Sequence, residues 1–272
     1  MKSHFFFVSA FFFLLLKPYS QQAQQVTFSE VFPPTPINPY FRFINGVTQD
    51  TLGYMWFASY SIGLIRYDGY QVTLFRNDPG NSNSLASNGI VCVFADGNGF
   101  IWAGTQSGLD RFDPRTGIFT HFRHRKEDLS SLSDDVVLAI LEDHNGILWV
   151  GTENGLNRMD MKTGTFTRYQ QNPNDATTLS CNRVQVLYED HQGTLWVGTA
   201  DSQRSFDSDE KGGLNKLDPK TGKFTRYLHN PNDSLTLINN RIGAIFEDSR
   251  GVFWVSTAGG WSAHHEQRER HI

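Results

Sequence analysis

Two short motifs contain side chains that could bind a metal ion. The segment 143–146 (DHNG) begins like a calcium-binding loop, but such a loop needs a glutamate at its twelfth position, where this chain has Asn154. His264 and His265 suggest a zinc-binding helix, but the residue four positions after His265 is Glu269 and not histidine. We therefore predict no metal site and no cofactor.

A second group of candidates consists of nucleophiles and carboxylates that could carry catalysis. The sequence has no G-x-S-x-G nucleophile elbow, no P-loop and no G-x-G-x-x-G dinucleotide motif. Its most regular carboxylates recur at one position of a repeat: Asp50, Asp96, Asp143, Asp190 and Asp248. An aspartate that is present in every copy is expected to cap a turn. We predict no catalytic residue, and the sequence alone leaves the binding residues unknown.

These side chains belong to a sequence repeat that is present in five copies. Tryptophan recurs at intervals of 46, 47, 47 and 58 residues, at Trp56, Trp102, Trp149, Trp196 and Trp254. A glycine lies three residues before each tryptophan and the aspartate lies six residues before it. A leucine-rich or β-helix solenoid is the alternative, but its repeat is about 20 to 30 residues long, which is too short for this period.

The best preserved copy shows how one unit divides into four strands. The apolar, β-branched segment 136–141 predicts a first strand, and the D-x-x-G after it supplies a turn into the tryptophan strand. An N-G pair before Leu156 begins the third strand, and T-G at 163–164 begins the alternating fourth strand. Four antiparallel strands per repeat predict an all-β propeller with about four complete blades, a partial fifth and an incomplete ring.

The tryptophans and the two cysteines fit the same scaffold. A tryptophan in every copy is expected to pack between neighbouring blades, where a large aromatic side chain buries roughly 150–250 Å². Stacking of these rings on a sugar is the alternative. Cys92 and Cys181 lie at different positions of non-adjacent copies, so we expect no disulfide between them.

The repeat resembles the two-component regulator propeller family, in which an aspartate and a glycine lead into W-x-G-T and then G-L-x-x-x-D. Segments 102–105, 149–152 and 196–199 match W-x-G-T, whereas the first and last copies read WFAS and WVST. The resemblance covers residues 40–260 and implies the periplasmic sensor region of a membrane-bound, often hybrid, histidine kinase of Gram-negative bacteria. It further implies an oligosaccharide as the ligand.

The N-terminus predicts export. Lys2 precedes the apolar run 5–16, which is shorter than the roughly 20 apolar residues that span a bilayer. We therefore predict a signal peptide over residues 1–23, with Ser20 or Ala23 before the cleavage point, and a periplasmic location. An uncleaved anchor is the alternative. Intact relatives are anchored in the inner membrane, so membrane contact is expected only through segments downstream of this chain.

Charge and loop length restrict the partners and their location. The formal charge of −4, with 24 basic and 28 acidic residues, leaves no excess of positive charge for nucleic acid. The long, polar connections that lead into each new blade, and an insertion of 11 residues between Thr199 and Leu214, all lie at one end of the strands. We expect ligand contacts there. The alternative is that the insertion is a solvent-exposed surface loop that binds nothing.

The repeat pattern breaks near the C-terminus. After Gly260 the pattern L-N-x-x-D is expected, but the chain reads WSAHHEQRERHI. We therefore expect the third and fourth strands of the fifth copy to be missing. In this interpretation residues 24–260 are propeller repeats, and 261–272 form a non-repeat tail that marks a truncation.

These observations predict a binding module and not an enzyme. The leading interpretation is an exported sensor propeller, a fragment of a hybrid histidine kinase whose kinase domain is absent from this chain. An exported enzyme acting on polysaccharide is one alternative, although it would need acid/base or metal residues that depart from the repeat. A secreted protein-interaction scaffold is another. The sequence does not decide whether the intact protein forms a homodimer.

Overall fold

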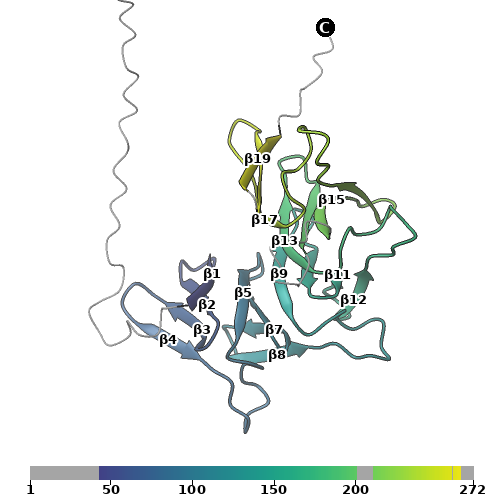
Figure 1. The fold of residues 1–272 in the computed structure, drawn as a ribbon. Helices are drawn as coiled ribbons and strands as arrows, with labels where there is room; N and C mark the ends of the chain where they lie inside the picture. Colours follow the sequence, from purple (N-terminus) through teal and green to yellow (C-terminus); the bar gives the residue numbers. More distant parts are fainter. Residues whose placement is uncertain (1–42, 201–210, 259, 265–272) are drawn as a thin grey trace, which may run out of the picture. The chain divides into compact units, whose positions relative to one another are not determined.

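Each repeat forms one antiparallel sheet, here called a blade, in the computed structural model (Figure 1). The structure describes residues 43–200, 211–258 and 260–264. The chain divides into two units, Met1–Thr35 and Pro36–Ile272, and all described residues belong to the second unit. The described residues form strands and no α-helix. They therefore include no helix that could cross a membrane, and the predicted all-β propeller class is confirmed.

The strands of the described residues follow the chain in simple meander order, with four strands in each of the first four blades and three in the fifth. Their bounds are β1 (Ile44–Gln49), β2 (Met55–Ser59), β3 (Gly63–Tyr67) and β4 (Val72–Phe75) in blade 1; β5 (Ile90–Ala95), β6 (Ile101–Thr105), β7 (Gly108–Asp113) and β8 (Ile118–Phe122) in blade 2; β9 (Val137–Glu142), β10 (Leu148–Thr152), β11 (Gly155–Asp160) and β12 (Thr165–Tyr169) in blade 3; β13 (Val184–Glu189), β14 (Leu195–Ala200), β15 (Gly212–Asp218) and β16 (Lys223–Tyr227) in blade 4; and β17 (Ile242–Glu247), β18 (Phe253–Thr257) and β19 (Gly260–His264) in blade 5.

The third strand of blade 5 corrects the expectation that this strand is missing. β19 pairs antiparallel with β18, from Thr257 opposite Gly260 to Phe253 opposite His264. Such a ladder uses backbone N–H and C=O groups, which any extended segment without proline can supply. The loss of the L-N-x-x-D pattern therefore changes the side chains of the third strand without preventing its pairing. Residues 265–272 lie outside the described residues.

The first strand of each blade lies against the first strand of the next. Contacts join β1 to β5, β5 to β9, β9 to β13 and β13 to β17. The first strands are therefore the inner strands of this series of blades. In every blade a register shift interrupts the pairing of the first two strands, as between Val184 and Val186. Bulges of this kind bend and twist a strand.

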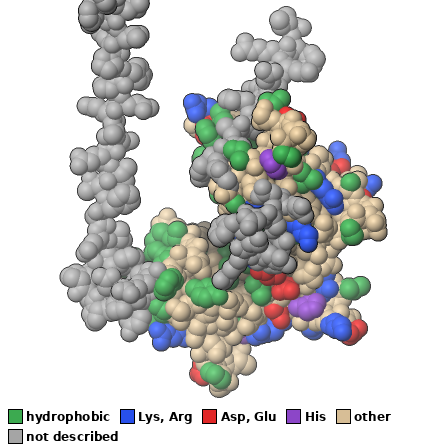
Figure 2. Space-filling model, viewed as in Figure 1, with side chains coloured by type: hydrophobic (Ala, Val, Ile, Leu, Met, Phe, Trp, Pro, Cys, Tyr) green, Lys and Arg blue, Asp and Glu red, His purple; other side chains and the backbone are tan. Residues whose placement is uncertain are grey.

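The hydrophobic core lies between the blades and not within one of them. Trp56 of blade 1 is fully buried and packs with Phe112 and Phe119 of blade 2. Trp196 of blade 4 packs against Phe253 of blade 5, with ring centroids 4.7 Å apart. Packing between neighbouring blades is therefore confirmed as the role of Trp56, Trp102, Trp149 and Trp196. On the face shown in Figure 2, hydrophobic side chains gather over blade 1, which carries several large exposed ones.

The glycine of the W-x-G-T pattern allows this close packing. A Cβ atom at Gly151 would lie 2.7 Å from both Cγ1 and the carbonyl oxygen of Val184, on the inner strand of the next blade. Gly104 and Gly198 meet the corresponding side chains equally closely. A side chain at these positions would push neighbouring blades apart. The W-x-G-T pattern is thus explained by contact between one blade and the next.

Candidate functional site

The blades have two ends, which we call the loop face and the turn face. The loop face carries the connections between the second and third strands and those from one blade to the next. The turn face carries the short turns between the first and second strands and between the third and fourth. Ligand contacts were predicted on the loop face, so its construction is described first.

The long connections of the loop face are held by side chains of the blade that follows them. Arg168 on β12 donates to three backbone carbonyl oxygens of the connection before blade 3, and Arg226 on β16 does the same before blade 4. In blade 2, His121 takes the place of the arginine, and Asp110 on the paired strand accepts a bond from the Ala86 N–H at 2.7 Å. The connections are therefore fixed by specific hydrogen bonds.

His121 shows how a buried charge supports this arrangement. Its Nδ1 lies 2.7 Å from Oδ1 of Asp110, whose side chain is fully buried, and its Nε2 lies 3.0 Å from the Ser82 carbonyl oxygen. The hydrogen bond to Asp110 raises the pKa of His121 above its usual value. Because this pair joins blade 2 to the connection before it, it contributes to the rigidity of the loop face.

A set of non-repeating residues lies on the loop face at the ends of the inner strands. We call it the inner rim and define it as Tyr60, Gln106, Glu153, Arg183 and Arg241. The first three follow the second strand of blades 1, 2 and 3, and the two arginines precede the first strand of blades 4 and 5. The five residues thus occupy two neighbouring backbone positions of the repeat.

The backbone of the inner rim is held in the same way in every blade. The N–H after the second strand donates to the carbonyl oxygen before the first strand, at 3.1–3.2 Å, in these pairs: Tyr60 to Phe43, Gln106 to Gly89, Glu153 to Val136, Ala200 to Arg183, and Ala258 to Arg241. No rim side chain takes part in these bonds. The side chains can therefore vary from blade to blade while the backbone stays fixed.

The rim side chains link neighbouring blades. Gln106 donates from Nε2 to the Tyr60 hydroxyl across blades 2 and 1. Arg183 of blade 4 pairs with Glu153 of blade 3, with Nη1 2.6 Å from Oε1. Both members of this ion pair are about one-quarter exposed, and the Tyr60 side chain is half-exposed. An aromatic ring, an amide and charged groups therefore lie in one series on the loop face.

The inner rim has the chemistry of a site for a polar ligand. Amide, guanidinium and carboxylate groups can donate to and accept from hydroxyl groups, and a half-exposed tyrosine offers an apolar face beside a polar tip. Among the described residues, no group of three or more His, Cys, Asp or Glu side chains is placed to hold a metal ion. The arrangement can bind and orient a hydroxylated ligand.

The turn face is built from repeating side chains. In each blade the recurring aspartate accepts two backbone N–H bonds within its own turn, and this confirms its predicted capping role. Its second oxygen accepts from Nε1 of the tryptophan six residues later, at 2.8 Å in four blades and 3.3 Å in the fifth. The aspartate therefore also fixes the ring that packs between blades.

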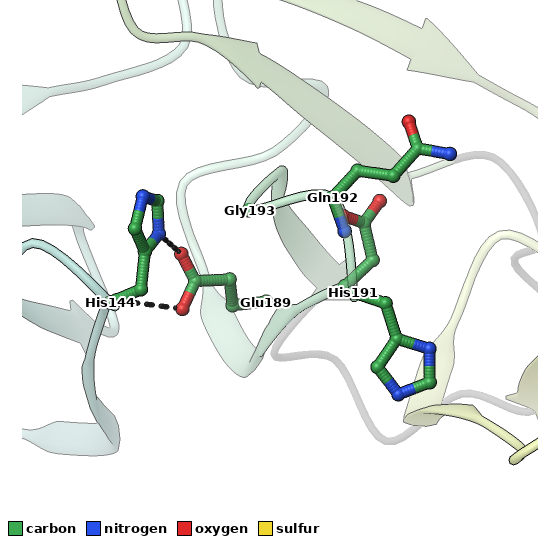
Figure 3. A pocket seen from close by; sticks show the side chains of 6 residues that line it. His144, Glu189, His191, Gln192 and Gly193 are labelled. Atoms are coloured by element: carbon green, nitrogen blue, oxygen red, sulfur yellow. Dashed lines mark hydrogen bonds and ion pairs between the residues drawn. The ribbon is translucent and has the colours of Figure 1, made fainter.

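Glutamates on the turn face connect blades 3, 4 and 5 to the blade before each of them. Glu142, Glu189 and Glu247 accept a bond from a turn N–H of the preceding blade, each at 2.9 Å. Glu189 also contacts Nδ1 of His144, and His191 lies 3.1 Å from Glu247. In Figure 3, His144 turns toward Glu189 while His191 points away from this pair. His144, Glu189 and His191 border an open hollow of about 310 Å³.

The electrostatics of the turn face follow from these contacts. The hydrogen bond to Glu189 raises the pKa of His144, and the charge of that carboxylate adds to the effect. The two groups belong to different blades, so the protonated histidine contributes to the junction between blades 3 and 4. Because His144 is largely exposed, solvent screens this contribution.

Several predicted features can now be placed. Most of the insertion, residues 201–210, lies outside the described residues, as do His265 and Glu269. Cys92 and Cys181 are both free. Burial raises the pKa of the Cys92 thiol to about 12, so this sulfur is protonated at neutral pH and is a poor nucleophile.

Sequence reasoning missed two parts of these faces. The glutamate seven residues before the tryptophan occurs in three of the five copies, so its recurrence was the available signal for the junctions of the turn face. The inner rim had a weaker signal, a variable residue directly after the nearly constant W-x-G-T. Its composition could be read from the sequence, whereas the contact of Arg183 with Glu153 required the register between blades.

Comparisons with known proteins agree with this architecture. The family model described as two component regulator propeller matches residues 84–107, 131–154, 178–201 and 236–259. No curated protein matches the sequence. The extracellular domain of the hybrid two component system BT3049 from B. thetaiotaomicron is similar at 25% identity and a TM-score of 0.69, over 83% of this chain and 29% of that chain.

Two further solved structures share the fold. The extracellular domain of the hybrid two component system BT4673 from B. thetaiotaomicron has 24% identity and a TM-score of 0.64, over 81% of this chain and 27% of that one. Virginiamycin B lyase from Staphylococcus aureus has 15% identity and a TM-score of 0.54, over 82% of this chain and 69% of that one. The chain thus spans less than a third of the two-component relatives that it matches.

Proposed function

We propose that this chain, which carries two component regulator propeller repeats, is a ligand-binding propeller of an exported hybrid two-component sensor. The observation that carries the proposal is its similarity, over 83% of its length, to the extracellular domain of such a system. Because the chain spans 29% of that domain, it corresponds to one part of a sensor. Phosphoryl transfer would be the task of a kinase region of the intact protein.

The proposed location is the periplasm. The similar two-component proteins were described as extracellular domains, and residues 1–23 have the short apolar run of a signal peptide. The inner membrane would be reached through other segments of the intact sensor. In this proposal the chain itself binds and does not catalyse.

The proposed ligand is an oligosaccharide bound on the loop face. Support comes from the inner rim, where Gln106, Glu153 and Arg183 present hydrogen-bonding groups beside the half-exposed ring of Tyr60. A fixed scaffold that carries variable side chains is the usual construction of a binding surface. On the turn face, by contrast, the aspartate that holds each turn is the same in every blade.

Calorimetric titration of the purified chain with a panel of oligosaccharides tests the proposal. One class should bind saturably, and Tyr60→Ala should weaken that binding about tenfold, equivalent to about 1.4 kcal/mol. Tyr70→Ala is the matched control, since Tyr70 is an exposed tyrosine of the same blade on the turn face. Absence of binding across the panel, or equal losses in the two variants, would refute the proposal.

A further inference from the structure

The inner rim contains two arginines at the same position of consecutive blades. Arg183 directly precedes β13 in blade 4, and Arg241 directly precedes β17 in blade 5. Their carbonyl oxygens accept equivalent backbone bonds from Ala200 and Ala258, at 3.2 and 3.1 Å. Both side chains are half-buried. The backbone of the two arginines is therefore held in the same way on the loop face.

Their surroundings in the preceding blade differ by one carboxylate. Arg183 pairs with Glu153, the residue that follows β10 of blade 3. The equivalent residue of blade 4 is Ala200, so the repeat offers Arg241 a methyl group in place of the carboxylate. Within the described part of the chain, the Arg241 guanidinium has no hydrogen bond, ion pair or aromatic contact. Among the described residues, one junction thus has a complete ion pair, and the next has only its cationic half.

We propose that Arg241 binds a carboxylate of an acidic oligosaccharide, in the place that Glu153 fills for Arg183. The inference rests on the proposed function of the loop face as an oligosaccharide site, and it adds the class of sugar, one that contains uronic acid. The planar guanidinium presents paired N–H donors that match the two oxygens of a carboxylate. Partial burial strengthens this interaction relative to one in bulk water.

The neighbouring junction supplies hydrogen-bonding groups beside Arg241, because Arg183 precedes β13, which contacts β17. A uronic acid ring carries hydroxyl groups as well as its carboxylate, and the Glu153 carboxylate and the Arg183 guanidinium can accept from and donate to hydroxyl groups. The Glu153–Arg183 pair is internally neutral, so the net positive charge of the rim comes from Arg241. A neutral oligosaccharide would leave this charge unused, whereas an acidic one would neutralise it.

Calorimetric titration of the purified chain tests the inference with two matched probes, short oligogalacturonates and their carboxyl-reduced neutral forms. The acidic oligomers should bind about tenfold more tightly or better, as expected for a charge-assisted hydrogen bond, and added salt should reduce the difference. Arg241→Gln should abolish the difference between the probes. Arg250→Gln is the control, because Arg250 belongs to the same blade but pairs with Asp248 on the turn face.

Glu153→Gln gives a test of opposite sign. It releases Arg183 from its internal partner, so the preference for the acidic over the neutral oligomers should increase several-fold. Thermal melts of all variants check that each one folds. Equal binding of the two probes, or identical behaviour of Arg241→Gln and the Arg250→Gln control, would overturn the inference and leave the proposed function standing. Failure of every oligosaccharide to bind would refute both.

Discussion

The turn face and the inner rim use the same backbone scaffold in opposite ways. On the turn face, carboxylates make the bonds that hold the backbone: Asp143 accepts two turn N–H groups and the Trp149 indole, and Glu189 accepts an N–H of the preceding blade. On the inner rim, backbone carbonyl groups hold the N–H groups of Gln106 and Glu153.

This difference explains which side chains repeat. Where the aspartate side chain is the hydrogen-bond partner of the backbone, its replacement removes the acceptor of two turn N–H groups, so every copy keeps the aspartate. Where a backbone carbonyl oxygen accepts the bond from the backbone N–H, the side chain at that position is not needed to hold the backbone. The inner rim can therefore carry a different residue in each blade, and its composition can follow a ligand. The predictions below test this separation of stability from binding.

The largest effect on stability is expected at the contact between neighbouring blades, between the loop face and the turn face. Gly151→Val places atoms within 2.7 Å of the Val184 side chain and its carbonyl oxygen, and a carbonyl on a paired strand cannot move aside easily. We expect a loss of about 3 kcal/mol in the free energy of unfolding, measured by urea denaturation. Gly117→Val, at a turn with φ of 74° and no atom within 4 Å of an added Cβ, is the control for a strained glycine outside the junction. A smaller loss at Gly151 than at Gly117 would contradict the explanation.

The next effect is expected on the turn face. Asp143→Ala removes the acceptor of three hydrogen bonds, at 2.9, 3.0 and 2.8 Å, including the one from the Trp149 indole. A loss of about 2 kcal/mol should follow, because each bond contributes about 0.5–1.5 kcal/mol net. Trp149 fluorescence should shift as its ring loses this partner. An unchanged unfolding midpoint would show that the turn does not depend on the aspartate.

These stability predictions depend on features that could be read from the sequence to different degrees. The spacing of Asp143, Gly146 and Trp149 predicted the turn and its strands, because turn chemistry is local. The indole bond of Asp143 could not be predicted, since it depends on how strand β10 twists after the turn. The third strand of blade 5 was missed because a side-chain pattern was used to judge a backbone ladder.

The candidate site, like the fold, could be predicted where it depends on local sequence but not where it depends on contacts between blades. The loop face was expected to bind because its connections are long and variable, which is a property of the sequence. The pairing of Arg183 with Glu153, and the contrast with Arg241, depend on which residues meet across a junction between blades. That junction brings together residues 30 positions apart in the chain, and its register is decided by packing in three dimensions.

A smaller, pH-dependent effect is expected at the junction between blades 3 and 4. The pKa of His144 is raised by Glu189, so its stabilising contribution is complete below the usual histidine value of about 6.5 and is lost as the pH rises through the raised value. His144→Asn should therefore lower the melting temperature at pH 6 and have little effect at pH 9. Glu189→Gln should remove the same pH dependence, and an equal effect of His144→Asn at both pH values would contradict the pairing.

The smallest effect on stability is expected at the inner rim, and it is the one that most directly tests the separation of roles. Gln106→Ala removes an exposed side chain whose bond to Tyr60 is not needed by the backbone, because the Gln106 N–H keeps its bond to the Gly89 carbonyl oxygen at 3.2 Å. The free energy of unfolding should change by less than about 0.5 kcal/mol, while the affinity for a bound oligosaccharide falls. Urea denaturation beside titration calorimetry measures both quantities on one preparation. If Gln106→Ala destabilised the chain as much as Asp143→Ala, the rim would be part of the scaffold, and its variation between blades would need another explanation than a ligand.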